Sequence, residues 1–323
     1  LKPISETNTC KIIQTKSFFG SLTNLSDVFM SEVKIYSLVL LFAEFDFSAI
    51  DDQKIPSFPE MTIELFVAFL QSGKTAQISF FYSGCCDAIG HLLSVTDFPN
   101  LKYNTYLRFA SVVKSIDVSR FKHNYLSSIL LNVSIWGRCS TGILRSITSY
   151  WLQELYPQTT NLFTSILNYP LLLLMIGKFY FDEKIVNNIF QLILQSEKAL
   201  NGDKFCILIS FCIGDRKLEE IKIYLEVLKK ILTETTISDE ILSKKIHNIS
   251  YLINLFDKND PEIFVKVIEI IIICHRNNYI KQINLTQNLE IAMRRTQKAN
   301  SSMLTLKPLL EKANAKDPEL YPL

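Results

Sequence analysis

Apolar residues recur three to four positions apart along most of this chain, with polar residues in the positions between them. After residue 182 the pattern is regular, and Ile185, Ile189 and Ile193 share one face of a helix. The same spacing runs through residues 218–232 and 242–256. No stretch keeps the two-residue alternation of a strand, so the pattern predicts an all-α protein.

Prolines, glycines and capping residues divide the apolar segments into helices. Gly73 follows one segment as a C-terminal glycine, and Asp260-Pro261-Glu262 offers a cap, a first-turn proline and a first-turn acid to another. Pro157 and Pro170 are expected to separate short helices. The predicted helices are residues 26–46, 60–72, 75–95, 103–116, 119–136, 143–156, 185–193, 218–232, 242–256, 261–274 and 304–315.

The helix predicted over 218–232 has a distinct polar side. Lys222, Glu226 and Lys230 are four residues apart there and are predicted to face solvent. By contrast, the helix that begins after Asp260 is apolar nearly all round, so it is predicted to be sandwiched between other helices.

Helix pairs recur about every 35–45 residues, which is the period of armadillo and HEAT repeats. No strict sequence repeat accompanies this period. The predicted fold is therefore an irregular armadillo/HEAT-like α-solenoid of helix pairs, with a globular helical bundle as the alternative. We expect an irregular N-terminal segment at 1–25, the solenoid at 26–296 with a subdivision near 182, and a polar C-terminal tail with a short helix at 297–323.

Composition narrows the class of protein. The chain is 48% hydrophobic with a mean hydropathy of +0.17, and 9 Gly and 10 Pro among 323 residues indicate an ordered protein. No apolar run reaches the roughly 18 residues of a membrane span. The net charge is +2 without a polybasic run, so nucleic acid is not an expected partner. The missing initial Met suggests a fragment of a longer protein.

No motif predicts catalysis, a metal or a cofactor. Ser72-Gly73-Lys74-Thr75 resembles the end of a phosphate-binding loop, but Ala68 stands where the first glycine is required. The four histidines have no second ligand at metal spacing, and the seven cysteines form no CxxC pair. We therefore expect reduced, buried cysteines, no small-molecule substrate and no enzyme, with a helical enzyme as the least favoured alternative.

Two groups of residues are candidates for interaction. Arg294, Arg295 and Lys298 form a basic patch suited to an anionic partner or a membrane surface. The aromatic residues, including Trp136 and Trp151, suit core packing or a docking face.

Residues 73–194 resemble a known family. Leu130-Leu131-Asn132 leads to Ile135-Trp136, a second apolar helix spans 143–155, and Leu171 to Leu174 precede Phe179-Tyr180-Phe181. The segments GKTAQISFFYSGCCDAIGHLL and YLRFASVVKSI come before them in a similar order. This arrangement resembles the armadillo-like α-solenoid upstream of the PH and BEACH domains in neurobeachin/beige-type proteins, although no BEACH or WD-repeat signature is present.

The resemblance implies a piece of a large cytoplasmic scaffold in vesicle trafficking or endolysosomal membrane dynamics, peripheral on endomembranes. Its partners would be other proteins or other domains of the same chain. Trp136, Trp151, Leu172 and Tyr180 would be packing residues of the family, and no catalytic residue carries over. The alternative function is a HEAT- or karyopherin-like adaptor that binds peptide segments in its groove.

Overall fold

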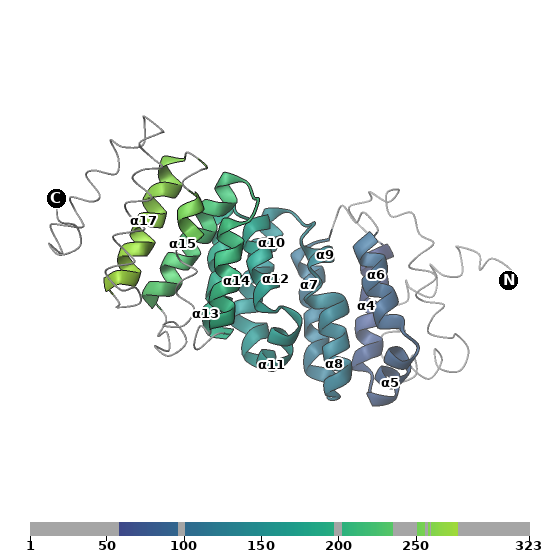
Figure 1. The fold of residues 1–323 in the computed structure, drawn as a ribbon. Helices are drawn as coiled ribbons and strands as arrows, with labels where there is room; N and C mark the ends of the chain where they lie inside the picture. The colour runs from purple at the N-terminus through teal and green to yellow at the C-terminus, as the bar shows by residue number, and fades with distance from the viewer. Residues whose placement is uncertain are drawn as a thin grey trace, which may run out of the picture. The chain divides into compact units, whose positions relative to one another are not determined.

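The structure is a computed structural model that describes residues 58–95, 101–196, 202–234, 251–255, 258 and 260–276 (Figure 1). These residues contain helices and turns and no strand. The helices are α4 (Phe58–Gln71), α5 (Lys74–Tyr82), α6 (Cys85–Val95), α7 (Tyr103–Val112), η2 (Val113–Ser115), α8 (Ser119–Tyr125), η3 (Leu126–Leu130), α9 (Val133–Trp136), α10 (Thr141–Tyr150), η4 (Trp151–Leu155), α11 (Tyr156–Ile166), α12 (Tyr169–Lys178), α13 (Glu183–Ser196), α14 (Gly202–Ile213), α15 (Leu218–Glu234) and α17 (Pro261–Arg276).

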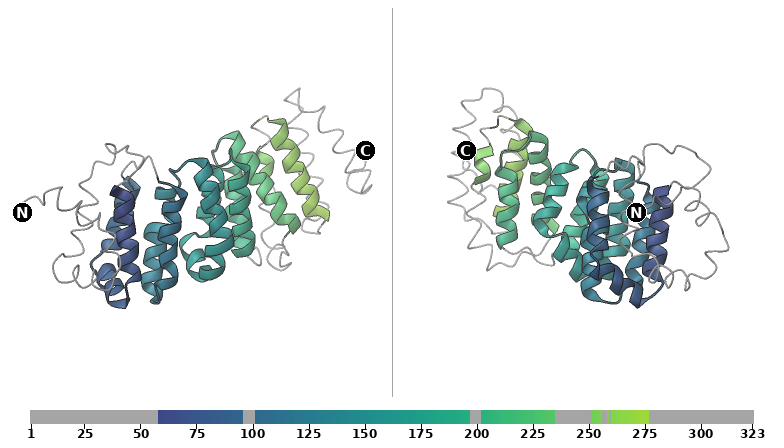
Figure 2. Two further views of the ribbon diagram at one scale, coloured as in Figure 1. Left: turned by 180° about the vertical axis from the view of Figure 1, so that it is seen from behind. Right: turned by 90° about the vertical axis from the view of Figure 1, so that its right-hand side faces the viewer.

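The chain divides into two compact units. Unit 1 contains the described residues up to Tyr150 together with Asn161–Ile166, and unit 2 contains Trp151–Thr160 and the described residues from Leu167 onward. The sequence had suggested a subdivision near residue 182. Within each unit the helices stack side by side (Figure 2), with the α4–α7 and α15–α17 pairs in closest association.

Polar contacts between stacked helices recur at a nearly constant sequence separation. In unit 1, Gln71 of α4 bonds Ser111 of α7, 40 residues on, and Asp87 of α6 bonds Ser128, 41 residues on. In unit 2, Lys229 of α15 bonds Glu269 of α17, again 40 residues on. This is the period of armadillo and HEAT repeats, which places equivalent helices of successive repeats beside each other. The predicted all-α, irregular solenoid of helix pairs is confirmed.

The helix predicted at 75–95 is two helices, because Gly84 interrupts it. Gly84 has φ 74°, a left-handed conformation that glycine adopts without strain, and its N–H bonds the carbonyl of Phe81. α5 therefore ends at Tyr82, and α6 begins at Cys85. The apolar residues on both sides of this break gave the appearance of one continuous helix.

The helix predicted at 119–136 is also interrupted. It widens into the π-helical turn η3, and α9 then starts at Val133. Asn132 causes the restart, since its side-chain oxygen accepts a hydrogen bond from the N–H of Ser134 at 3.0 Å.

The helix break predicted at Pro157 lies two residues further on, at Thr159. The π-helical turn η4 precedes Pro157, and Thr159 has non-helical angles (φ −137°, ψ 27°), so α11 consists of two helical segments that meet at a kink. Proline lacks the N–H that a continuing helix requires, which favours a break close to it. Pro170 behaves as predicted, since it lies in the first turn of α12 behind the capping residue Asn168.

Among the later helices, α13, α15 and α17 follow their predictions closely, whereas α14 was not predicted. Asp260 caps α17, and its carboxylate accepts hydrogen bonds from the N–H groups of Glu262 and Ile263. α15 buries its predicted apolar side, apart from a partly exposed Leu218. The expected sandwiching of α17 is borne out to the extent that seven of its described side chains are buried: Ile263, Phe264, Val267, Ile268, Ile270, Ile271 and Cys274. The predicted segments 1–25, 26–46, 304–315 and most of 242–256 lie outside the described residues.

Candidate interaction surfaces

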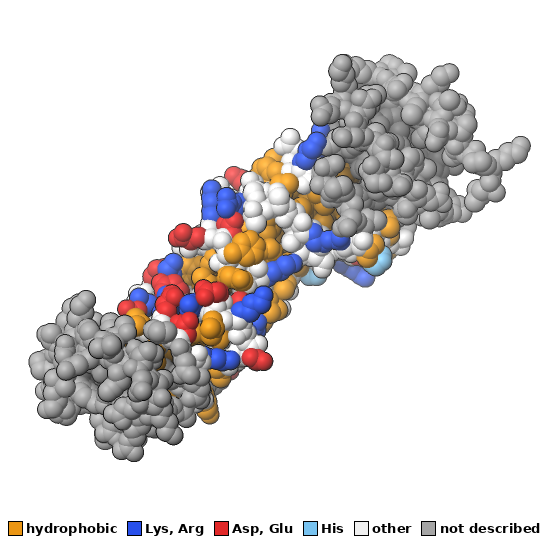
Figure 3. Space-filling model, turned by 90° about the horizontal axis from the view of Figure 1, so that it is seen from above, with side chains coloured by type: hydrophobic (Ala, Val, Ile, Leu, Met, Phe, Trp, Pro, Cys, Tyr) orange, Lys and Arg blue, Asp and Glu red, His pale blue; other side chains and the backbone are white. Residues whose placement is uncertain are grey.

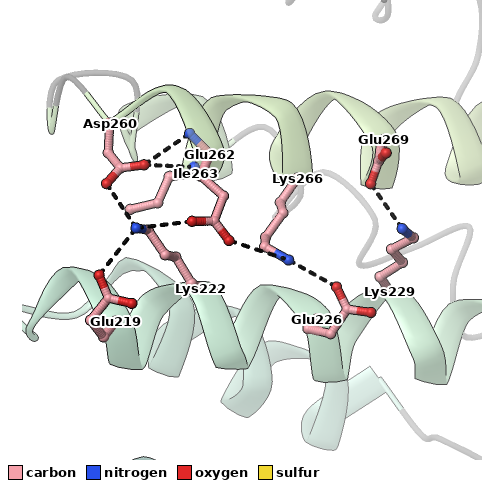
Figure 4. A network of polar contacts seen from close by, with 9 residues as sticks. All are labelled: Glu219, Lys222, Glu226, Lys229, Asp260, Glu262, Ile263, Lys266 and Glu269. Atoms are coloured by element: carbon pink, nitrogen blue, oxygen red, sulfur yellow. Dashed lines mark hydrogen bonds and ion pairs between the residues drawn. The ribbon is translucent and has the colours of Figure 1, made fainter. Parts of the chain in front are cut away.

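A charged seam joins α15 to α17 in unit 2 (Figure 4). The ammonium group of Lys222 lies 3.1 Å from a carboxylate oxygen of Glu219, 3.1 Å from Asp260 and 3.0 Å from Glu262. Lys266 pairs with Glu226 at 3.0 Å, and Lys229 pairs with Glu269 at 2.9 Å. The charged seam thus consists of Glu219, Lys222, Glu226, Lys229, Asp260, Glu262, Lys266 and Glu269.

Burial within the charged seam decreases along the two helices. The exposed fraction of the lysine side chain is 14% at Lys222, 20% at Lys266 and 34% at Lys229. An ion pair gains strength as water is excluded from it, so Lys222 is the position where charge matters most.

The protonation equilibria reflect this pairing. Burial by itself lowers the pKa of Lys222, but the hydrogen bonds that its ammonium group donates to Glu262, Glu219 and Asp260 outweigh this effect and raise that pKa. Burial raises the pKa of Asp260, whereas the Ile263 N–H and Lys222 lower it, and the net pKa is below the ordinary value. The pKa of Glu226 is lowered in the same way by Lys266 against an opposing effect of burial. The pairing therefore stabilises the charged forms of Lys222, Glu226 and Asp260.

The sequence-based prediction that the polar side of α15 faces solvent is wrong for most of the residues concerned. Lys222 and Glu226 were expected to face solvent, but they face α17, and Lys230 lies over the ring of Phe190 at 5.5 Å. A signal was present in the sequence. Lys222, Glu226 and Lys229 each have an opposite charge 40 residues later, at Glu262, Lys266 and Glu269.

In unit 1, the contact between α6 and the η3 turn is formed by hydrogen bonds from neutral side chains and by a close approach of the two backbones. One carboxylate oxygen of Asp87 accepts hydrogen bonds from Ser128 Oγ at 2.6 Å and Asn124 Nδ2 at 3.0 Å. One turn further along α6, a Cβ atom at Gly90 would collide with the carbonyl oxygen of Ser128. Only a residue without a side chain lets α6 approach the η3 turn this closely.

Trp136, one of the four predicted packing residues, is fully buried in unit 1. Its Nε1 donates a hydrogen bond to the carbonyl of Ile129 at 2.6 Å, and the ring of Tyr106 meets it edge-on at 4.9 Å. Trp151, in unit 2, is also fully buried. Leu172 is buried in α12, while Tyr180 is only partly buried and lies edge-on to Phe181 at 5.8 Å.

Exposed apolar side chains occur in both units. Tyr82 is 74% exposed at the end of α5, and Phe181 is 63% exposed after α12. Figure 3 shows acidic and basic side chains mixed at the end of unit 2 that carries α15 and α17.

Four of the described cysteines, Cys85, Cys86, Cys212 and Cys274, are buried. Burial raises the pKa of the thiols of Cys86, Cys212 and Cys274, which keeps them protonated and weakly nucleophilic. Gly73 and Lys74 lie at the start of α5, where Gly73 has φ 149°, rather than in a phosphate-binding loop. Among the described residues, no group of three or more His, Cys, Asp or Glu side chains is arranged to hold a metal ion.

Two further predictions concern membranes. The basic patch Arg294, Arg295 and Lys298 lies outside the described residues. Within the part of the chain that is described, no single helix is long and apolar enough to cross a membrane, while α5 with α6, and Thr141–Ile166 with α12, reach that length and composition as bent pairs.

Comparison with known proteins identifies the family. The model of the neurobeachin/BDCP α-solenoid region (DUF4704) matches residues 38–302. No curated protein matches the chain. Among solved structures, the crystal structure of an engineered protein aligns over 97% of this chain and 95% of its own, at 11% identity and a TM-score of 0.26, which is too low to carry an argument. Because the family model covers most of the chain, this protein belongs to the neurobeachin/BDCP α-solenoid family, as the resemblance of residues 73–194 had suggested.

Proposed function

We propose that this chain is a non-catalytic scaffold segment of a large BEACH-type protein that acts in vesicle trafficking or endolysosomal membrane dynamics. The observation that supports this proposal is the match of residues 38–302 to the neurobeachin/BDCP α-solenoid region. The chain would work in the cytoplasm, peripheral on endomembranes.

The physics of stacked helices suits such a role. Each helix pair buries its apolar face against its neighbours, so the outer surfaces remain free for other proteins or for other domains of the same chain. The charged seam and the Gly90 contact fix neighbouring helices against each other within each unit. A fixed helix stack holds attached domains at a defined spacing, and this requires no reactive side chain.

The basic patch Arg294, Arg295 and Lys298 belongs to the same proposal as a contact for an anionic partner or membrane. Its test replaces all three residues by Ala and measures binding to phosphatidylserine vesicles. A matched control replaces Lys178, Lys184 and Lys217 by Ala, which removes the same amount of charge from exposed positions elsewhere. Unchanged vesicle and partner binding in the Arg294/Arg295/Lys298 variant would remove the patch from the proposal.

The whole proposal is tested in two steps. First, the full-length transcript should encode PH, BEACH and WD-repeat domains downstream, and their absence would favour the karyopherin-like adaptor. Second, the endogenous protein carrying a fluorescent tag should colocalise with endolysosomal markers, and its deletion should alter endolysosome size or number. Normal organelles after deletion would contradict the trafficking role.

A further inference from the structure

One end of unit 1 exposes apolar and basic side chains together. Along α5, Lys74, Ile78 and Tyr82 are spaced i, i+4 and i+8, so they share one face of the helix. All three are exposed, with Ile78 at 39% and Tyr82 at 74%. A stripe of this kind on a short surface helix presents a cation, an aliphatic side chain and an amphipathic ring to the solvent.

Aromatic contacts hold this stripe against the start of α8. The ring of Phe81 stacks on Phe121 at 4.7 Å with an interplanar angle of 12°, and Tyr82 meets the same ring edge-on at 5.6 Å. Gln77 of α5 is also linked to η2, the turn that precedes α8, since its Nε2 donates a hydrogen bond to the carbonyl of Ser115 at 2.8 Å. Tyr82 is therefore exposed and held in place, which lowers the entropic cost of binding through it.

Basic residues lie next in sequence to the residues that contact α5, namely Ser115 and Phe121. Lys114, Arg120 and Lys122 lie on the segment that contacts α5, in addition to Lys74 on α5 itself. The acidic residues nearby are Asp117, which is exposed, and Asp87, whose carboxylate accepts hydrogen bonds from Ser128 and Asn124. We name this surface, formed by Lys74, Ile78, Tyr82, Lys114, Arg120 and Lys122, the α5–α8 end.

We propose that the α5–α8 end docks on an anionic lipid membrane. Tyrosine is enriched at membrane interfaces because its ring is amphipathic, and lysines near the surface gain about 1 kcal/mol each from anionic lipid headgroups. Three of the four cations are lysines, a residue depleted from protein–protein interfaces, so the composition favours a membrane over an acidic protein partner. This inference concerns lipid affinity alone and is independent of the proposed trafficking role.

Vesicle sedimentation of the purified 323-residue chain tests the proposal. The chain should bind phosphatidylcholine vesicles that contain phosphatidylserine, bind pure phosphatidylcholine weakly, and dissociate as the salt concentration rises. Neutralising two cations, in the variant Lys74→Gln/Arg120→Gln, should weaken binding about thirtyfold. The matched control Lys184→Gln/Lys217→Gln removes two exposed lysines of unit 2 and should bind like the wild type.

A fluorescence arm tests the contact itself. Trp136 and Trp151 are buried, so a Tyr82→Trp variant adds one exposed indole whose emission should shift to the blue on vesicle binding. Phe181→Trp, at the exposed aromatic residue of unit 2, is the control and should not shift. The proposal is overturned if the wild type does not bind phosphatidylserine vesicles. It is overturned as well if the Lys74→Gln/Arg120→Gln variant and the Lys184→Gln/Lys217→Gln control lose vesicle affinity equally. It is also overturned if only the Arg294→Ala/Arg295→Ala/Lys298→Ala variant loses binding, or if polyglutamate binds and vesicles do not.

Discussion

Units 1 and 2 stack their helices at the same sequence separation but join them by different chemistry. In unit 1, α6 meets the η3 turn through Gly90, and Asp87 accepts hydrogen bonds from neutral side chains. In unit 2, α15 meets α17 through lysines and carboxylates that bridge the two helices. Both contacts join residues about 40 positions apart. The two units thus share the spacing of the repeat, while the residues that join their helices differ.

This difference explains why the repeat leaves no regular sequence signature. A solenoid requires only that each helix bury an apolar face against the next one, and many side chains satisfy that requirement. At Gly90 the close approach of α6 to η3 requires a residue without a side chain, whereas α15 and α17 are joined by long charged side chains that bridge the two helices. The two solutions should therefore respond differently to mutation, with steric changes dominating in unit 1 and charge changes in unit 2.

The largest expected effect is that of Trp136→Ala in unit 1. Truncation of this buried ring removes its contact with Tyr106 and leaves the Ile129 carbonyl without its donor. The free energy of unfolding should fall by about 3–5 kcal/mol, measured as the shift of the urea midpoint. The control is Phe181→Ala, where the ring is exposed and the change should be small. A near-neutral Trp136→Ala would instead return Trp136 to the role of a docking residue.

The second prediction tests the close approach at Gly90. In Gly90→Ala the new Cβ meets the backbone carbonyl of Ser128, which cannot rotate away, so unit 1 should lose about 2–3 kcal/mol. Hydrogen exchange of the amides in α6 and η3 reports the loss locally.

Gly177→Ala in unit 2 is the matched comparison for Gly90→Ala. There the new Cβ meets the hydroxyl of Tyr224, the end of a side chain, which donates a hydrogen bond to the Leu173 carbonyl at 2.9 Å. Adding Tyr224→Phe should relieve part of the damage. No substitution on α6 or η3 that keeps the backbone in place can rescue Gly90→Ala in this way, and an equally mild effect at both glycines would contradict the steric distinction.

The third prediction concerns Lys222→Met, which removes the cation shared by three carboxylates. Asp260 would then lose its cation in a site where its side chain is 15% exposed, whereas Glu219 and Glu262 are more than half exposed and screened by solvent, so unit 2 should lose about 1–2 kcal/mol. Faster hydrogen exchange in α15 and α17, with no change in α6, would localise the effect. A stable variant would show that the seam contributes little beyond its apolar contacts.

The sequence predicted more of unit 2 than of unit 1, and the reason is physical. α15 and α17 are long helices with a capping residue or a clear apolar face, so local patterns determine them. In unit 1 the breaks at Gly84 and Asn132 depend on one residue each within apolar runs. The charged seam was missed because a polar helix side was equated with solvent, although tertiary stacking placed opposite charges against it.

Acid should destabilise unit 2 through this seam. The pKa values of Glu226 and Asp260 are lowered in the folded state, so their contribution is present above the ordinary values of 4.5 and 3.8 and is lost as the pH falls through the folded-state pKa. The raised pKa of Lys222 contributes below its ordinary value of 10.5 and is lost only in strong base. Between neutral pH and pH 3, the protection factors of the α17 amides, which correct for slower intrinsic exchange in acid, should fall more steeply in the wild type than in Lys222→Met. Parallel curves would place the acid-sensitive groups elsewhere.

The smallest expected effect is that of Lys229→Met, which removes the most exposed lysine of the seam. Lys229 forms an ion pair with Glu269, and both side chains are about one-third exposed, so solvent and salt screen the pair and its loss should cost at most about 0.5 kcal/mol. The exchanged pair Lys229→Glu/Glu269→Lys should restore only part of the wild-type stability, because Glu226 also interacts with the charge at position 229. An effect as large as that of Lys222→Met would mean that the seam acts as one cooperative network. In that case, the gradient of burial from Lys222 to Lys229 would not govern its strength.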